Sequence, residues 1–241
     1  MDAAKGTYNM LMGGGAPGTA RFESVDPTLH NWTAADLQFY PTNSGPSEFF
    51  PLPRSVSQPQ ADGRGSGVQY THVLSGIVPP APYRGGTPWY TLGVYDNATQ
   101  RFTNTTTPRP LDYSDSVIYA QLHEDNGRML FVGWFNVGAS ALTAPREVVY
   151  DAEMEVLRVL PVDELKALRG AQLGKHPTPV SLAAGKGVME VFDRSAQPTT
   201  SFDLEAEIAL PHASAGVSFG AAILAADRNT AEVYITVSVG Q

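Results

Sequence analysis

Three acidic and two aromatic residues of this chain have side chains that could take part in catalysis or ligand binding. Glu48, Asp112 and Asp115 carry carboxyl groups, and Tyr113 and Trp134 carry aromatic rings. Two carboxyl groups that lie close together can act as nucleophile and as general acid and base. Aromatic rings beside such a pair would offer stacking surfaces to a ligand. A plainer interpretation makes Glu48 a solvated or hydrogen-bonded carboxylate at the start of a strand.

Residues 111–135 must position four of these five side chains, and their pattern predicts a β-hairpin. Val117–Leu122 is strand-like, and Asn126-Gly127 is a strong hairpin signal because both residues tolerate positive φ. The return strand, Arg128–Phe135, is almost wholly apolar. We therefore expect it to be covered on both faces, which places the hairpin inside a multi-sheet β structure.

The rest of the chain also reads as short strands separated by Gly- and Pro-rich turns. We expect further strands at Tyr8–Met12, Arg21–Val25, Val68–Ile77, Trp89–Tyr95, Gln100–Thr103, Glu147–Tyr150, Val156–Leu160, Gly187–Phe192, Ser201–Leu210, Val217–Ala225 and Glu232–Val239. One short helix is predicted at Asp163–Arg169, with Asp163 as its cap and Gly170 as its stop.

Two features that could suggest chemistry have simpler explanations. Gly13–Gly18 is a glycine-rich loop after a strand, but no helix-forming stretch or Gly-Lys-Ser/Thr follows it, so phosphate binding is not expected. His72 lies within a predicted strand, where a hydrogen-bonded histidine is commoner than a catalytic one.

Composition narrows the classes of partner and cofactor. The net charge is −8 over 241 residues and no Lys or Arg cluster occurs, which argues against nucleic acid and anionic membranes as partners. No stretch approaches the ~20 apolar residues of a membrane span. The chain has no cysteine, so disulfides and Cys-based metal sites are excluded, and we expect no cofactor and no metal.

The targeting signals in the sequence do not determine the cellular compartment of the protein. The N-terminus lacks the basic start and apolar run of a signal peptide. Three N-glycosylation sequons begin at Asn31, Asn97 and Asn104. If they are used, they imply a secreted ancestor.

Two blocks of sequence resemble glycoside hydrolase family 32, the family of invertases, inulinases and levanases. The first block consists of Asp112-Tyr113, Tyr119-Ala120 and Gly127–Trp134. The second consists of Pro145–Val148 followed by Val159–Leu165. The resemblance implies an all-β fold: an incomplete five-bladed β-propeller over residues 1–160, a helical linker over 161–170 and a partial β-sandwich over 171–241. By this comparison the chain is truncated at both ends, and the family suggests a secreted or vacuolar protein.

The resemblance does not extend to the family's catalytic carboxylates. The nucleophile motif (Trp-Met-Asn-Asp-Pro-like) and the Arg-Asp-Pro motif are both absent, since Val25 stands before Asp26-Pro27. In the family's Glu-Cys-Pro-Asp-Phe-Phe-Pro-like motif, the Glu is the acid/base. An ungapped alignment on Phe49-Phe50 places that Glu at Gly45, and Glu48 takes the role only if three residues are deleted.

Glu48 is accordingly the only acid/base candidate, and the resemblance implies Asp112, Tyr113 and Trp134 as possible contacts to a fructoside or another neutral carbohydrate. The chain would be a family 32-like relative of the β-fructofuranosidases that is catalytically impaired on its own. The alternatives are a carbohydrate-binding or scaffold protein, one chain of a split fructoside hydrolase, or a glycosidase with rearranged carboxylates that pairs Asp112 or Asp115 with Glu48.

Open sheet edges favour a homo- or hetero-oligomer in each of these cases. A carbohydrate-binding role would use aromatic side chains as stacking platforms, although each of them is more often a core residue. These aromatic residues are Trp89, Tyr90, Tyr113, Tyr119 and Trp134.

Overall fold

The computed structural model describes most of the first 172 residues and parts of the remainder. The described residues are 6–15, 18–40, 46–58, 66–76, 87–113, 117–135, 141–172, 205, 218–223 and 233–238. The chain divides into two compact units, Met1–Leu165 and Lys166–Gln241, which are described separately below.

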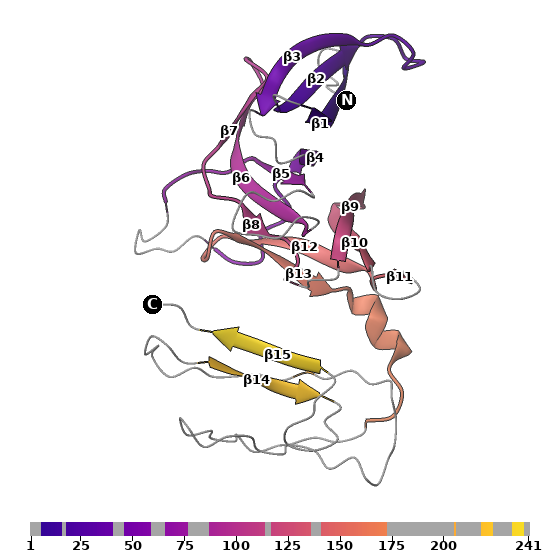
Figure 1. The fold of residues 1–241 in the computed structure, drawn as a ribbon, viewed down its shortest axis with the longest axis vertical. Helices are drawn as coiled ribbons and strands as arrows, with labels where there is room; N and C mark the ends of the chain where they lie inside the picture. Colours follow the sequence, from indigo (N-terminus) through magenta and orange to yellow (C-terminus); the bar gives the residue numbers. More distant parts are fainter. Residues whose placement is uncertain are drawn as a thin grey trace. The chain divides into compact units, whose positions relative to one another are not determined.

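Three antiparallel sheets make up the described part of the first unit (Figure 1). The β1–β3 sheet contains β1 (Tyr8–Gly15), β2 (Gly18–Ser24) and β3 (Thr33–Tyr40) in that order. The β4–β8 sheet has the order β4 (Pro46–Pro51), β5 (His72–Gly76), β6 (Trp89–Asp96) and β7 (Arg101–Asn104), and β8 (Arg109–Pro110) pairs with β6. The β9–β13 sheet joins β9 (Val117–Asp125), β10 (Arg128–Phe135), β12 (Arg146–Asp151) and β13 (Val156–Pro161), and β11 (Ala141–Leu142) pairs with β10. These sheets confirm the predicted all-β class.

The three sheets stack through two apolar clusters. Phe39, Leu74, Trp89 and Phe102 form the first cluster, between the β1–β3 and β4–β8 sheets. The second cluster fills the space between the β4–β8 and β9–β13 sheets. Its buried members are Phe50, Tyr70, Val73, Tyr90, Leu92, Leu111, Val117, Ala120, Met129, Phe131, Val148, Tyr150 and Leu157. The middle sheet is therefore packed on both faces, as blades within a propeller are.

The predicted hairpin is the β9–β10 pair, and its turn has the expected geometry. Asn126 and Gly127 have φ values of 52° and 79°, which matches the positive φ that a tight hairpin turn requires at both positions. The expectation that the return strand is covered on both faces is wrong at its end. Met129 and Phe131 are buried, whereas Trp134 on the other face is 43% exposed.

A segment between β4 and β5 pairs with the end of β12 in the β9–β13 sheet. Ser55 forms a parallel bridge with Tyr150 of β12. The backbone N–H of Tyr150 donates to the carbonyl of Arg54, and that of Val56 donates to the carbonyl of Tyr150. The Ser57 hydroxyl adds a 2.7 Å hydrogen bond to Asp151. Residues 54–57 thus extend a sheet whose strands begin about sixty positions later in the chain.

The predicted helix exists as a 3₁₀ helix, Asp163–Leu168 (η1). Within Lys166–Gln241, the described strands are β14 (Ser218–Ile223) and β15 (Val233–Ser238), which form an antiparallel hairpin. They match two of the predicted strands, whereas Gly187–Phe192 and Ser201–Leu210 lie outside the described residues, apart from Glu205. In the described part of the chain, no helix has the length and apolar character needed to cross a membrane.

Candidate functional site

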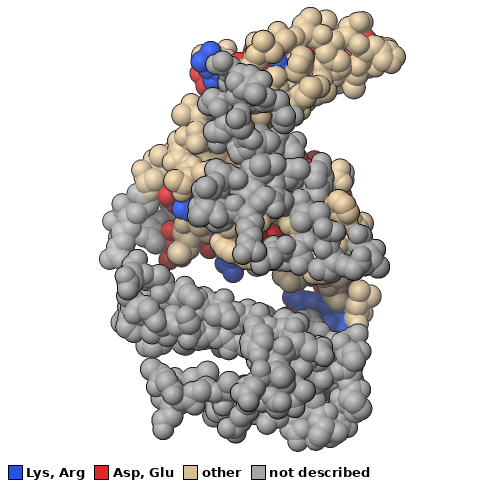
Figure 2. All heavy atoms as spheres, viewed as in Figure 1, with Lys and Arg blue, Asp and Glu red and all other residues tan. Residues whose placement is uncertain are grey.

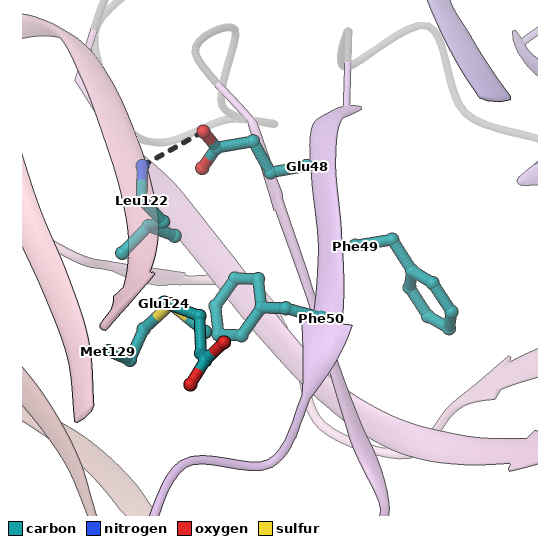
Figure 3. Close-up of a pocket in the computed structure, with 6 residues that line it drawn as sticks. All are labelled: Glu48, Phe49, Phe50, Leu122, Glu124 and Met129. Atoms are coloured by element: carbon teal, nitrogen blue, oxygen red, sulfur yellow. Dashed lines mark hydrogen bonds between the residues drawn. The ribbon is translucent and has the colours of Figure 1, made fainter. Parts of the chain in front are cut away.

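A pocket of about 290 Å³ lies where the edge strands β4 and β9 face each other (Figure 3). Figure 3 shows Glu48 and Phe50 projecting from β4 toward β9 and β10, while Phe49 points to the opposite side of the strand. The alternation follows from the two-residue period of a β-strand. The residues that line the pocket are Glu48, Phe49, Phe50, Leu122, Glu124 and Met129.

The Glu48 carboxylate is held by hydrogen bonds to both neighbouring elements. Its Oε1 accepts from the backbone N–H of Leu122 at 2.9 Å, and its Oε2 accepts from the Ser75 hydroxyl at 3.3 Å. Burial raises the pKa of Glu48 above its ordinary value, and the two hydrogen bonds oppose that effect. A raised pKa is what a general acid requires. Hydrogen bonding to both oxygens, in contrast, is typical of a carboxylate that holds two elements together.

The second carboxyl group of the pocket belongs to the hairpin turn. Glu124 Oε1 accepts a 2.8 Å hydrogen bond from the backbone N–H of Gly127. In Figure 3 the Glu124 carboxyl lies beside the Phe50 ring, well separated from that of Glu48. Glu124 therefore stabilises the Asn-Gly turn, and it is not paired with Glu48.

Asp112 is buried and forms an ion pair with Arg146 of β12. Arg146 Nη1 donates a 2.5 Å hydrogen bond to Asp112 Oδ2, and the guanidinium group lies 4.4 Å from the centroid of the Phe131 ring. Asp112 is 5% exposed, and the ion pair with Arg146 compensates the charge of its buried carboxylate.

The residues that bind Glu48 and Asp112 lie at the two ends of one row of residues that crosses the β9–β13 sheet. Phe131 of β10 lies directly opposite Leu122 of β9 on one side and opposite Arg146 of β12 on the other. Leu122 binds Glu48 and Arg146 binds Asp112. The two anchors are separated by two strand spacings, about 10 Å. The two carboxylates are thus bound by residues of different strands, β9 and β12, of one sheet.

Tyr113 and Trp134 are both solvent-accessible, but the structure does not bring them to the pocket together. Tyr113 follows Asp112 and is 87% exposed. Trp134 lies on the opposite face of β10 from Met129, which lines the pocket. The expectation that aromatic residues are core is correct for Trp89 and Tyr90, which are buried, and wrong for Tyr113 and Trp134. The side chain of Tyr119 and all of Asp115 lie outside the described structure.

His72 is a packed strand histidine, as expected. Its ring stacks on Phe49 with centroids 4.8 Å apart and lies 5.0 Å from the Tyr95 ring. Nδ1 is 3.1 Å from the Thr71 hydroxyl, and burial lowers the pKa of His72. The described residues contain no cluster of three or more His, Cys, Asp or Glu that could hold a metal ion.

The sequence motifs gave no indication of the partners that fix the acidic residues. Ser75 and Leu122 bind Glu48 from 27 and 74 positions away. Arg146 belongs to the block that resembles family 32, but nothing in the sequence indicates that it pairs with the buried Asp112.

The fold and the pocket define an all-β protein of blade-like antiparallel sheets with a half-buried carboxylate between the edge strands of two sheets. No protein-family model matches the sequence, and no curated protein matches it. Among solved structures, fructan 1-exohydrolase IIa from Cichorium intybus is similar over 69% of this chain, with a TM-score of 0.53 and 18% identity. A GH32 β-fructofuranosidase from Bombyx mori is similar over 69% of this chain, with a TM-score of 0.51 and 20% identity.

These similarities confirm the family 32-like fold that the two sequence blocks indicated. The matched regions make up 34% and 37% of those two structures, so this chain spans about a third of their length. A further structure of the Cichorium intybus enzyme, in complex with 1-kestose, matches with a TM-score of 0.51 and 19% identity.

Proposed function

We propose that this chain is a relative of the β-fructofuranosidases that does not hydrolyse fructosides by itself. The observation that supports this most directly is that residues of two different strands bind the half-buried Glu48 carboxylate and the buried Asp112 carboxylate. Glu48 and Asp112 are bound to Leu122 and Arg146, which lie two strands apart in one sheet. A retaining mechanism needs a nucleophilic carboxylate about 5–5.5 Å from the acid/base, whereas Asp112 is bound by Arg146 in an ion pair.

The chemical state of each carboxylate supports the same proposal. Asp112 is neutralised by Arg146, and a nucleophile in an ion pair of this kind is less available for attack on a sugar. Glu48 retains the features of an acid/base residue, namely partial burial and a raised pKa. It would therefore need a nucleophile that is not among the acidic residues around its pocket.

Hydrolysis is tested by incubating the purified chain with sucrose, 1-kestose and inulin and measuring released fructose. We expect no release above that of a buffer control. Release that disappears in Glu48→Gln would overturn the proposal and would identify Glu48 as the acid/base. Release that persists in Glu48→Gln would point to a contaminating hydrolase.

A second candidate, carbohydrate binding without turnover, is favoured by the exposure of Tyr113 and Trp134. Tyr113 is next to the Asp112–Arg146 pair, so a sugar could stack on its ring and hydrogen-bond to these polar groups. Trp134 would serve a separate contact on the other face of its sheet. Titration calorimetry with 1-kestose should detect weak binding, and Tyr113→Ala should weaken it roughly fivefold, the loss of about 1 kcal/mol of ring contact. Met154→Ala, an exposed residue of the β12–β13 turn, is the matched control.

A third candidate is one subunit of a split fructoside hydrolase, in which another polypeptide supplies the nucleophile. Glu48 keeps the features of an acid/base residue while Glu124, the other acidic residue that lines its pocket, is bound to the hairpin turn, and this arrangement favours the candidate. Native mass spectrometry of the protein isolated from its source would reveal such a complex, and fructose release by the complex but not by the isolated chain would support the candidate.

A further inference from the structure

The strand β7 forms an open edge of the β4–β8 sheet (Figure 1). In the described part of the chain, β7 pairs with β6 alone, so its other side has backbone N–H and C=O groups that no strand satisfies. An edge of this kind is a template on which a strand of another chain can pair. The protein therefore needs a means of keeping other strands away from β7.

Charge gives this edge little protection. Natural sheets commonly block an exposed edge with charged side chains. The sequence of β7 is Arg-Phe-Thr-Asn, which contains one charged residue, and its Phe102 is a buried core residue. Figure 2 shows that charged side chains are sparse over the described surface on the visible face of the molecule. Another kind of protection has to be sought near the ends of β7.

Two N-glycosylation sequons lie at the two ends of β7. Asn97 is in the β6–β7 turn, just before the strand, and Asn104 is the last residue of the strand. Each begins an Asn-X-Thr sequence. Both asparagines are exposed. The open edge is thus bracketed by two accessible attachment sites.

The β6–β7 turn is held together by the residue that precedes Asn97. The Asp96 carboxylate accepts a 2.8 Å hydrogen bond from the backbone N–H of Ala98 and a 2.7 Å hydrogen bond from the Thr99 hydroxyl. Neither bond involves the side chain of Asn97. A sugar attached to the Asn97 amide therefore leaves the bonds that shape this turn in place.

The backbone after Asn104 is likewise fixed without the asparagine side chain. The backbone N–H of Leu92 donates a 2.9 Å hydrogen bond to Thr106 Oγ1, and that of Thr105 donates a 3.0 Å bond to the carbonyl of Leu92. The Thr91 hydroxyl donates a 2.7 Å bond to the carbonyl of Thr106. These bonds hold residues 105–106 against β6, so an attached sugar at Asn104 is compatible with the folded sheet.

The third sequon, at Asn31, has a different setting. Asn31 Nδ2 donates a 3.0 Å hydrogen bond to Asp26 Oδ2, so its amide helps to hold the β2–β3 turn. Asn31 precedes β3, whereas Phe39, near the other end of β3, belongs to the cluster that contains Phe102 of β7. A sugar at Asn31 would therefore lie away from the β7 edge.

We propose that Asn97 and Asn104 carry N-linked glycans and that these two glycans shield the open edge of β7. The donor is a lipid-linked oligosaccharide diphosphate. Asparagine Nδ2 forms a bond to the anomeric carbon of the sugar, the bond from that carbon to the diphosphate oxygen breaks, and Nδ2 loses one proton to the transferase and then to water. A glycan is bulky and well hydrated, so a second strand cannot approach the edge beside it.

The first test maps the modification on the full chain, secreted from cultured mammalian cells behind a secretion leader. Peptide N-glycosidase in heavy-oxygen water converts each glycosylated asparagine to a labelled aspartate. Arg101 lies between the two sequons, so trypsin places them on separate peptides. We expect label at both Asn97 and Asn104, and Asn97→Gln and Asn104→Gln should each remove one glycan from the intact mass. Absence of the label from either peptide would overturn the proposal.

The second test measures protection of the edge by light scattering at increasing protein concentration. The double variant Asn97→Gln with Asn104→Gln should aggregate at a lower concentration than wild type, while its circular dichroism spectrum stays unchanged. Asn31→Gln, which removes the sequon away from β7, is the matched control and should behave as wild type.

Enzymatic removal of glycans from folded wild-type protein should reproduce the behaviour of the double variant, and it does not depend on how that variant folds. Deglycosylated protein that stays as soluble as the glycosylated form would overturn the shielding role. Aggregation of Asn31→Gln to the same extent as the double variant would overturn it as well, because the effect would then not belong to the β7 edge.

Discussion

The backbone N–H of Leu122 donates a 2.9 Å hydrogen bond to the carboxylate of Glu48, and this bond joins two neighbouring sheets. In the described part of the chain, β9 pairs with β10 alone, so its other edge has backbone groups that no strand satisfies. Glu48 satisfies one of them. The residue that resembles a catalytic acid therefore also has a structural role, and the two roles can be separated by substitution.

Replacement of Glu48 should separate loss of the hydrogen bond from loss of the charge. Glu48→Ala leaves the partly buried Leu122 N–H without its acceptor and should cost about 1–3 kcal/mol in the free energy of unfolding. Glu48→Gln keeps an oxygen acceptor in the same place and should cost less. Urea denaturation of both variants measures the difference, and equal losses for the two would show that the acceptor is unimportant.

Because the pKa of Glu48 is raised in the folded state, its ionisation should lower the stability of the protein as pH rises. The folded state binds the proton more tightly than the unfolded state, whose Glu pKa is 4.5. The contribution of Glu48 to stability is therefore fully present below pH 4.5 and is lost as pH rises through the folded-state pKa. Relative to wild type, Glu48→Gln should gain stability between pH 4 and pH 7. A difference that is constant across this range would contradict the raised pKa.

Removal of Arg146 should be more damaging than its partial exposure suggests. Arg146→Met removes the ion-pair partner of the buried Asp112 carboxylate and also the contact with the Phe131 ring. We expect a loss of about 2–3 kcal/mol in unfolding free energy. The double variant Arg146→Met with Asp112→Asn should recover part of it, since no buried charge remains. Full additivity in this double-mutant cycle would rule out coupling between the two residues.

Gly93 of β6 should not tolerate a side chain. A Cβ atom at this position would overlap the Phe102 ring and the backbone oxygen of Thr103, and backbone cannot move aside as a flexible side chain can. Gly93→Ala should therefore destabilise the protein by about 1–3 kcal/mol, the usual cost of overpacking. Gly170→Ala, where a Cβ meets nothing within 4 Å, is the matched control and should change stability little. Thermal unfolding of the two variants measures the contrast.

Local signals in the sequence were sufficient for the elements with short-range causes. Asn126-Gly127 specifies its own turn, so β9 and β10 could be placed from the sequence. Thr33–Tyr40 lacks a clear two-residue alternation, and β3 was accordingly not expected. The predicted strand at Val68–Ile77 is shorter, because β5 begins at His72. Its length is decided by pairing with β4 and β6, which the segment itself does not encode.

The candidate site could be predicted only residue by residue. Glu48 was singled out as an acid/base candidate, but its partners Ser75 and Leu122 come from other strands and reveal themselves only when the sheets pack. Asp112 was singled out for the sugar, and its ion pair with Arg146 depends on a fold that brings residues 34 positions apart together. Spacing along the chain carries no information on such contacts.

The pairing of residues 54–57 with β12 has a consequence for folding during synthesis. Tyr150 finds its backbone partners in Arg54 and Val56, nearly a hundred positions earlier. The ribosome must therefore synthesise all of the intervening strands before this pairing can form. Until then, the backbone groups of residues 54–57 lack their partner strand. Contacts of such long sequence separation slow folding. The nascent chain would be most prone to misassociation during this stage, before residues 54–57 pair with β12 and complete the β9–β13 sheet.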